Sequence, residues 1–294
     1  MASLARFDDR TASLRGPGRA PRLRADAPVL TTFRTLAAVE FDRSLSRLIE
    51  SEIIPRLMMA HGPEVPVVCS QEIADQEIAA LAPLSLQVEA DALLGHVEAI
   101  LARGVTIDTL MVDLLAPTAR LLGELWESDA LDFVDVTMGL WRLQEVVHEV
   151  AARRPADRGQ ADHGRRALFA TMPGDQHSFG TVVVDEVFRR GGWATDRMSG
   201  PATPELVGRV VQDWYDLIGL TVSCDAHIGP LKSVIVALRN VSKNPRVCIM
   251  VGGRVFSTDP QLAARVGADG TAGDARRALT LADDLVRVRD GEGL

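Results

Sequence analysis

The sequence predicts a helical N-terminal region followed by an α/β domain on a five-stranded parallel sheet of flavodoxin-like type. Two observations predict this fold class. In the first half of the chain, apolar residues recur at three- and four-residue steps, which is typical of amphipathic helices. From residue 166 onward, strand-like runs alternate five times with helix-like runs, which is typical of a doubly wound parallel sheet.

The helical half divides into three predicted segments. Residues 1–30 form an Arg-rich arm, and residues 31–69 form a helical extension. The helical pattern of this extension ends at His61-Gly-Pro63. Residues 70–153 contain four helical runs with short breaks between them. These runs lie near 71–82, 86–103, 106–126 and 132–152. Short connections and striped apolar faces predict an antiparallel four-helix bundle.

Particular residues mark the ends and irregularities of these helices. Ser70 is a suitable N-cap for the first run, Gly104 stops the second, and Thr106 can cap the third. Pro117 lies inside the apolar stripe of the third run. Because proline lacks an N–H and clashes with the preceding turn, it predicts a kink there.

Residues 154–165 are rich in Arg, Asp, Pro and Gly and predict a linker to an α/β domain over residues 166–290. Ligands of such sheets bind beyond the carboxyl ends of the strands, where the strand order reverses. His177, Thr221 and Gly252 fall at the ends of the first, third and fourth predicted strands, so the binding site is expected there. The strands are expected near 166–172, 193–198, 216–222, 246–251 and 268–271, and the helices near 178–190, 203–213, 228–240, 259–266 and 273–287.

Composition excludes several classes of protein. No run approaches the roughly 18 apolar residues of a membrane span, and no hydrophobic signal segment is evident, so a cytoplasmic protein without a membrane partner is expected. Cys69, Cys224 and Cys248 are widely spaced, which favours reduced thiols over a disulfide framework. The net charge of −8 and the pI near 5.3 argue against non-specific DNA binding.

The N-terminal arm departs from this acidic balance. Its composition predicts disorder, and it is either a plain flexible tail or an arm that touches nucleic acid or an acidic partner. Within the first 35 residues, the basic residues are Arg6, Arg10, Arg15, Arg19, Arg22, Arg24 and Arg34, against Asp8, Asp9 and Asp26.

The loop after the first predicted strand carries the most informative motif. Asp175 precedes His177 by two residues, and Gly180 follows. In this arrangement the imidazole supplies one nitrogen to a metal, while the carboxylate accepts the other ring N–H and fixes the tautomer. A lone histidine in a loop is more often a surface group, so the surrounding elements must support the metal-ligand interpretation.

This Asp-x-His-x-x-Gly spacing resembles the signature of cobalamin-binding domains. The resemblance implies that His177 is the lower axial cobalt ligand and that the nucleotide tail of the cofactor lies in a slot near Thr221 and Gly252. Thr221 stands where the family has serine, and Ser223 where it has leucine. The residues that the resemblance assigns to cofactor binding in this domain are Asp175, His177, Ser178, Phe179, Gly180, Thr221, Val222, Ser223, Gly252 and Gly253.

The third helical run is similar to the helical cap that precedes the corrin domain in corrinoid methyltransferase proteins and light-sensing regulators. That likeness implies that Trp126 covers the upper face of the corrin; a core aromatic is the alternative. The regulators that bind adenosylcobalamin carry a Glu-His pair where this chain has Val136 and Thr137. We expect Trp126, Met138 and Trp141 to crowd the upper face, which favours hydroxo- or aquocobalamin.

Residues 122–141 also resemble the AerR/PpaA antirepressors of purple photosynthetic bacteria. This resemblance implies a cobalamin-dependent, light-responsive transcriptional regulator without catalytic activity. Its implied partner is a repressor of photosystem genes of the CrtJ/PpsR type, with DNA contacted only through that partner. A corrinoid methyl-transfer protein remains the alternative function, and haem remains an alternative ligand for His177.

Overall fold

The structure, a computed structural model, describes residues 72–155 and 164–291 of the 294-residue chain. The predicted arm over residues 1–30 and the helical extension over residues 31–69 lie outside the described residues. So does most of the predicted linker. None of the described helices combines the length and the apolar character needed to cross a bilayer.

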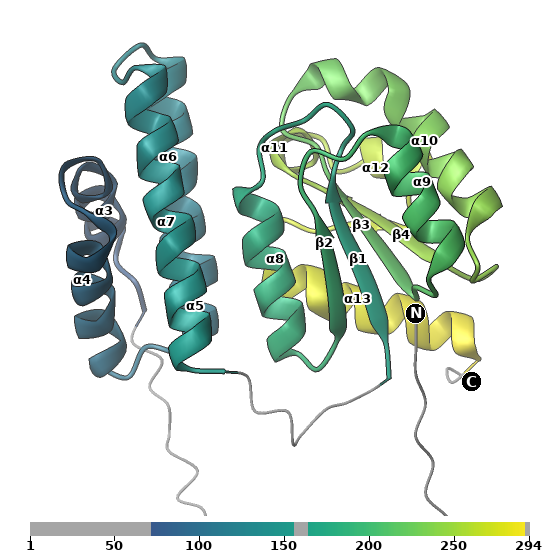
Figure 1. Cartoon of the computed structure of the whole chain (residues 1–294), viewed down its shortest axis with the longest axis horizontal. Helices are drawn as coiled ribbons and strands as arrows, with labels where there is room; N and C mark the ends of the chain where they lie inside the picture. The colour runs from purple at the N-terminus through teal and green to yellow at the C-terminus, as the bar shows by residue number, and fades with distance from the viewer. Residues whose placement is uncertain (1–71, 156–163, 292–294) are drawn as a thin grey trace, which may run out of the picture. The chain divides into compact units, whose positions relative to one another are not determined.

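Four helical segments form the first half of the described chain (Figure 1). The third segment is continuous and contains α5, a π-helical stretch η2, and α6. The bounds are α3 Asp75–Gln87, α4 Ala90–Ala102, α5 Ile107–Thr109, η2 Leu110–Leu115, α6 Ala116–Glu127 and α7 Phe133–Arg153. These segments match the four predicted runs, although the first two begin later than expected.

Helix α3 differs from the prediction at both ends. It begins at Asp75 rather than near Ser70, because the Glu77 carboxylate accepts the N–H of Ala74 and closes the first turn. It also continues through Pro83, where a break was expected, and ends at Gln87. By contrast, the predicted cap at Thr106 is confirmed, since its hydroxyl accepts the N–H of Thr109 at 3.1 Å.

The structure accommodates Pro117 through a change of helix type. Residues Leu110–Leu115 form a π-helix, in which Ala116 donates to the carbonyl of Met111, five residues earlier. Pro117 is the second residue of α6 and follows the π-helical stretch directly, so the local change of helix type accommodates its missing N–H. The buried Thr118 hydroxyl donates to the Leu114 carbonyl at 2.8 Å. Single π-turns inside α-helices frequently mark functional sites.

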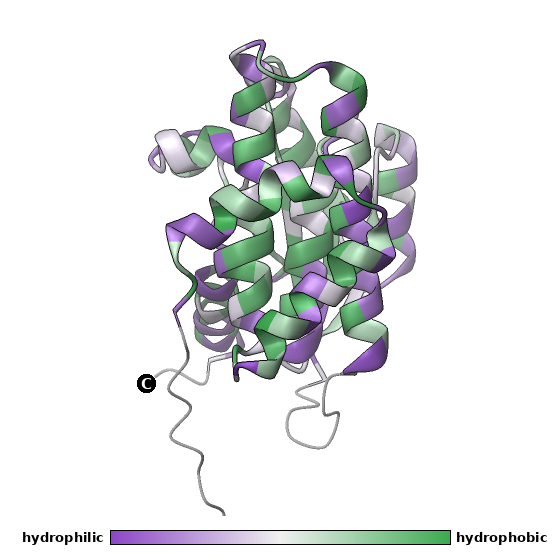
Figure 2. Ribbon diagram, turned by 90° about the vertical axis from the view of Figure 1, so that its left-hand side faces the viewer, coloured by the Kyte–Doolittle hydropathy of each residue, from purple (hydrophilic) through white to green (hydrophobic). Residues whose placement is uncertain are grey.

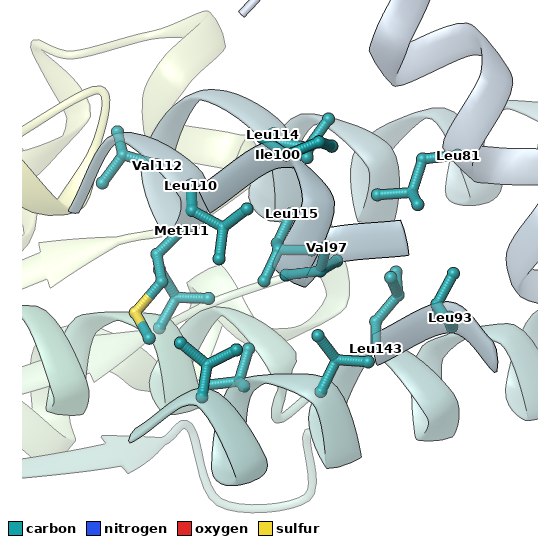
Figure 3. Packing of buried hydrophobic residues seen from close by; sticks show 14 of the residues in the cluster. Leu81, Leu93, Val97, Ile100, Leu110, Met111, Val112, Leu114, Leu115 and Leu143 are labelled. Carbon is teal, nitrogen blue, oxygen red and sulfur yellow. The ribbon is translucent and has the colours of Figure 1, made fainter. Parts of the chain in front are cut away.

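The core of the bundle includes one helix of the α/β domain. Figure 3 shows leucine and valine side chains of the helical segments packed together with Met111. Phe179, Val182, Val183 and Val187 of helix α8 (Phe179–Arg190) join the same buried cluster. Helix α8 is therefore shared between the bundle and the sheet.

The α/β domain contains five parallel strands in the order β2-β1-β3-β4-β5, which confirms the flavodoxin-like prediction. The order reverses between β1 and β3, so the topological switch point lies at the carboxyl ends of these two strands. The strands are β1 Arg166–Thr171, β2 Ala194–Met198, β3 Leu217–Thr221, β4 Cys248–Gly252 and β5 Gly270–Thr271.

Helices cover both faces of the sheet (Figure 1). Helices α8 and α13 pack on one face through Phe169, Phe188 and Trp193, and α9, α10 and α12 pack on the other through a second apolar cluster. Figure 2 faces the helical region, and there hydrophobic (green) and hydrophilic (purple) residues share the same helices, as expected for amphipathic helices. The remaining helices are α9 Thr203–Gln212, α10 Ile228–Val241, α11 Arg254–Thr258, α12 Leu262–Val266 and α13 Ala275–Asp290.

The register of the parallel strands places the ends of β1, β3 and β4 side by side. Thr171 pairs with Thr221, and Thr221 pairs with Gly252. The loops that follow these residues therefore start at the same level of the sheet, and they carry the predicted binding residues. The helix expected over 259–266 is the shorter α12, and a further short helix that was not expected, α11, begins directly after Gly253.

The middle of β3 provides a test of the packing. A Cβ added at Gly219 lies 2.6 Å from the Phe169 ring, so Gly219→Ala should lower the free energy of unfolding by about 1–3 kcal/mol through overpacking. Gly208, inside helix α9, has open space around it, so Gly208→Ala should raise that free energy by about 0.5–1 kcal/mol. Urea denaturation of both variants measures the contrast, and equal effects would contradict the packing of β3.

Candidate functional site

Hydrogen bonds join the three loops at the switch point. The N–H of Met172 donates to the Thr221 carbonyl at 2.8 Å, and the N–H of Val222 donates to the Gly252 carbonyl at 2.9 Å. The N–H of Ser223 donates to the Asp175 carboxylate at 2.8 Å. These bonds fix the β1, β3 and β4 loops relative to one another, so the loops form one rigid edge.

Asp175 is the centre of this edge. Its carboxylate is buried, and it accepts three hydrogen bonds. One oxygen, Oδ1, accepts from the backbone N–H of His177 at 3.0 Å and from Nδ1 of the same residue at 2.7 Å. The other, Oδ2, accepts from Ser223. A buried carboxylate with three donors satisfies the requirement that buried charge be hydrogen-bonded.

These contacts shift the pKa of Asp175 and the pKa of His177 in opposite directions. Burial alone raises the pKa of Asp175, but the bonds from His177 and Ser223 outweigh it and lower that pKa to about 2. The hydrogen bond to Asp175 raises the pKa of His177 against the opposing effects of burial and of the Arg254 charge. Asp175 is therefore ionised at neutral pH and can only accept hydrogen bonds.

The geometry selects one tautomer of His177. Because the Asp175 carboxylate can only accept, Nδ1 of the neutral imidazole carries the proton, and Nε2 presents its lone pair. The side chain is 60% exposed, so Nε2 is accessible from outside the loop. A buried carboxylate that orients an exposed imidazole is the arrangement of a metal-ligating histidine and its supporting partner.

Two glycines at the end of β4 have different roles. Gly253 has a φ of +107°, and a Cβ there lies 2.2 Å from the Val222 carbonyl oxygen, so only glycine fits. A Cβ at Gly252 meets no atom within 4 Å, and the same holds at Gly180. Gly252 and Gly180 therefore border open space at the edge that carries His177.

The other predicted residues of the domain lie on the same loops but face in different ways. The hydroxyls of Thr221 and Thr181 are 3.3 Å apart, and Ser223 contributes its backbone N–H to Asp175. Phe179 and Val222 are buried in the two cores. Their side chains support the loops from beneath, so only their backbones can face a ligand.

The helical cap presents large apolar side chains to the outside. Trp126 is 44% exposed, Trp141 is 49% exposed and Met138 is 39% exposed. The alternative interpretation of Trp126 as a core aromatic is therefore wrong. Exposed tryptophans cost free energy unless something covers them, so these side chains are favourable places for a ligand or partner to bind.

Two contacts between the cap and the loops were not predicted from the sequence. Gln144 of α7 donates its side-chain amide to the Ser178 hydroxyl at 3.1 Å, directly beside His177. Arg254 at the start of α11 pairs with Glu127 at the end of α6 at 2.8 Å. No sequence motif indicates either pair, because the partners are 34 and 127 residues apart.

Comparison with known proteins agrees with this geometry. Residues 165–281 match the family model described as the B12 binding domain. The chain carries a B12-binding domain. The match begins beside β1 and ends inside α13, so it includes all three loops that Asp175 and its neighbours hold together.

Two further likenesses extend beyond the B12-binding domain. An uncharacterized 20.5 kDa protein in the bchF-crtJ intergenic region of Rhodobacter capsulatus is 27% identical over 168 residues, covering 57% of this chain and 87% of that protein. The monomethylamine corrinoid protein of Methanosarcina barkeri has the same fold, with a TM-score of 0.59 at 18% identity, over 72% of this chain and 100% of its own. The fold likeness to the Methanosarcina barkeri protein therefore extends over more of the chain than the B12-binding domain alone.

Of the other histidines, His227 lies near the loop of the B12-binding domain that carries His177. It ends a short 3-10 turn after β3, and a Cβ added at Gly174 lies 3.6 Å from its Cε1. His227 has no buried carboxylate arranged like Asp175 in its loop. It is therefore a useful control position for experiments on His177.

The shifted pKa values of the ligand-free B12-binding domain predict a pH dependence of stability. The lowered pKa of Asp175 contributes stability that is present above about pH 4 and is lost as the pH falls toward 2. The raised pKa of His177 contributes stability that is present below its usual pKa and is lost as the pH rises through the raised one. Asp175→Asn should remove both contributions. At pH 7 we expect it to lower the free energy of unfolding by on the order of 2 kcal/mol.

Urea denaturation at a series of pH values measures these effects, and proton NMR of His177 reports the fall of its pKa in the variant. Asp225→Asn, a change at an exposed carboxyl in the neighbouring loop, is the matched control. An Asp175→Asn protein with the wild-type pH profile below pH 4 would contradict the buried carboxylate.

Proposed function

We propose that this chain is a cobalamin-binding, light-responsive transcriptional regulator, an antirepressor that takes up hydroxo- or aquocobalamin. The observation that carries the proposal is the oriented Asp175–His177 pair at the switch point of a B12-binding domain. His177 would bind cobalt from the lower side through Nε2. Asp175 would hold the imidazole in place and keep its basicity high.

The residues present fit such a cofactor. His177 is accessible and has a fixed tautomer. Gly252 and Gly180 leave open space beside it, and the Thr221 hydroxyl lies at the same strand edge, where it can bond the displaced nucleotide tail. When bound, the corrin would supply a cobalt ion with an exchangeable water or hydroxide ligand, and light would act earlier, by labilising the upper ligand of a free or bound cobalamin so that the hydroxo form can bind. The protein supplies orientation and exclusion of water.

The helical cap supports the preference for a small upper ligand. Trp126, Met138 and Trp141 are exposed, bulky and apolar, and they would cover the upper face of the corrin. Val136 is buried in the bundle and Thr137 bonds its own helix through the Phe133 carbonyl. Neither supplies a strong cobalt ligand from above. Trp126, Met138 and Trp141 would leave room above the corrin for water or hydroxide and would hinder a bulky adenosyl group.

The genomic position in the name of the Rhodobacter capsulatus relative supports a regulatory role. A protein encoded between bchF and crtJ suits control of photosystem genes, and a repressor of the CrtJ/PpsR type is the partner we propose. Binding of the cofactor to the closed cap would shift the population toward that state. The closed state would bind the repressor, and DNA would be affected only through it.

A corrinoid methyl-transfer protein is the second candidate. The fold of the Methanosarcina barkeri monomethylamine corrinoid protein favours it, because that protein also joins a helical region to such a domain. Methyl turnover from methylcobalamin to a thiol would support this candidate. Haem bound to His177 is distinguished by a Soret band in the purified protein.

Replacement of the proposed cobalt ligand gives a direct test. His177→Ala should abolish cobalt–imidazole coordination, because no other group takes the place of Nε2. Absorption spectra and the nitrogen hyperfine pattern in the EPR of the reduced Co(II) form measure this. His227→Ala should leave both unchanged. An unaltered hyperfine pattern in His177→Ala would show that His177 is not the ligand.

The side chains proposed to cover the upper face of the corrin lead to a separate prediction. Wild-type protein should bind hydroxocobalamin more tightly than adenosylcobalamin in darkness, and Trp141→Ala should reduce this preference by opening space above the corrin. Binding titrations of both cofactors measure the ratio. Tight uptake of adenosylcobalamin by the wild type, with weak binding of hydroxocobalamin, would contradict the proposed form of the cofactor.

The regulatory role is tested with the proposed partner. Repressor of the CrtJ/PpsR type should be captured by the full-length protein when hydroxocobalamin is present and much less when it is absent, and its binding to a photosystem promoter should change accordingly. Gel-shift and pull-down assays measure this. The His177→Ala variant serves as the control, and cofactor-independent behaviour of the wild type would contradict the proposal.

A further inference from the structure

The cap is attached to the B12-binding domain in two different ways. Along helix α8 the attachment is apolar and buried, because Phe179, Val182 and Val183 belong to the same core as the leucines of the bundle. The Gln144–Ser178 hydrogen bond strengthens this side. Separation along α8 would expose a continuous apolar surface to water, so this side is fixed.

The third helical segment contacts the rest of the domain through exposed ion pairs as well. At one end, Glu127 pairs with Arg254 at 2.8 Å, and at the other, Asp113 pairs with Arg276 at 3.0 Å. The two carboxylates are 14 residues apart along one helical run, which corresponds to about 20 Å. All four side chains are substantially exposed.

The Glu127–Arg254 pair joins the two sides of the proposed cofactor site. Glu127 follows Trp126 directly, and Arg254 follows Gly253, which ends the β4 loop. The Asp113–Arg276 pair involves the π-helical stretch and the first turn of α13 instead.

The strength of such a pair suits a contact that opens and closes. An exposed ion pair shifts an equilibrium by only about 1.5-fold to fivefold, since water and salt screen both charges. A contact this weak cannot hold the cap permanently. It can bias the cap between an open state, which a corrin the size of cobalamin needs for entry, and a closed state.

We propose that Arg254 and Glu127 form a latch that closes the helical cap over the corrinoid site, with helix α8 as the fixed side. The latch controls the retention of a corrinoid and, by setting the gap beneath Trp126, discrimination against a bulky upper ligand. This inference rests on the proposed cobalamin-binding function. It assigns a positioning role to two residues that make no contact with cobalt.

Hydrogen–deuterium exchange of the ligand-free, full-length protein tests the latch without any cofactor. In Arg254→Gln and in Glu127→Gln, amides of residues 120–131 should exchange about 1.5-fold to fivefold faster than in the wild type. Those of residues 179–190 in α8 should be unchanged. Arg276→Gln is the matched control, because it breaks an equally exposed pair on the same helical run and should leave residues 120–131 unaffected.

Charge reversal distinguishes the effect of losing the ion pair from the effect of a local loss of packing. Arg254→Glu together with Glu127→Arg should restore slow exchange, while either reversal alone should not. For the corrinoid, dark release of bound hydroxocobalamin into excess cyanocobalamin should accelerate by the same factor in the two glutamine variants and not in Arg276→Gln. In the same two glutamine variants, the preference for hydroxocobalamin over adenosylcobalamin should also fall.

The outcomes distinguish this inference from the proposed function. If the wild type binds no cobalamin, the proposed function fails, and the exchange experiment still decides whether the pair closes the cap. If Arg254→Gln and Arg276→Gln behave alike in exchange, or if the double reversal fails to restore protection, the latch is overturned even when cobalamin binding is intact.

Discussion

The site depends on one buried carboxylate. Asp175 lies in the loop after β1 and accepts hydrogen bonds from two loops, including the backbone N–H of Ser223 after β3. Burial penalises its charge, so the carboxylate is stable there only while its donors are in place. The same bonds fix the His177 ring, and structural stability and metal-ligand orientation therefore rest on the same contacts.

The topology and register of the sheet determine where this carboxylate lies. Parallel strands in the order β2-β1-β3-β4-β5 reverse direction of winding at β1 and β3, and this opens a crevice at their carboxyl ends. Thr171, Thr221 and Gly252 end at one level because the ladder is in register. Gly253 then allows the β4 loop to approach the Val222 carbonyl more closely than any side chain permits.

Helix α8 couples the site to the cap. It begins two residues after His177, its buried face packs in the core of the bundle, and it also contacts the sheet beside β1 and β2. Packed side chains therefore connect the loop that holds His177 with the helices that carry Trp126 and Trp141. The π-helical stretch before Pro117 lies in the same bundle and lets the long third segment keep its apolar face inward.

The sequence by itself determined the elements and their order. Alternating strand and helix patterns, the Thr106 cap and the Asp175–His177 spacing are local features, so propensity, periodicity and short-range hydrogen bonding decide them. Local signals were insufficient at Pro83 and Pro117, where packing of the bundle overrode the cost of proline. Only the tertiary structure decided which distant groups meet: the Ser223 N–H with Asp175, Gln144 with Ser178, and Glu127 with Arg254. These partners lie 34 to 127 residues apart, and no local pattern encodes such a pairing, because it follows from how the sheet and the bundle bring their surfaces together.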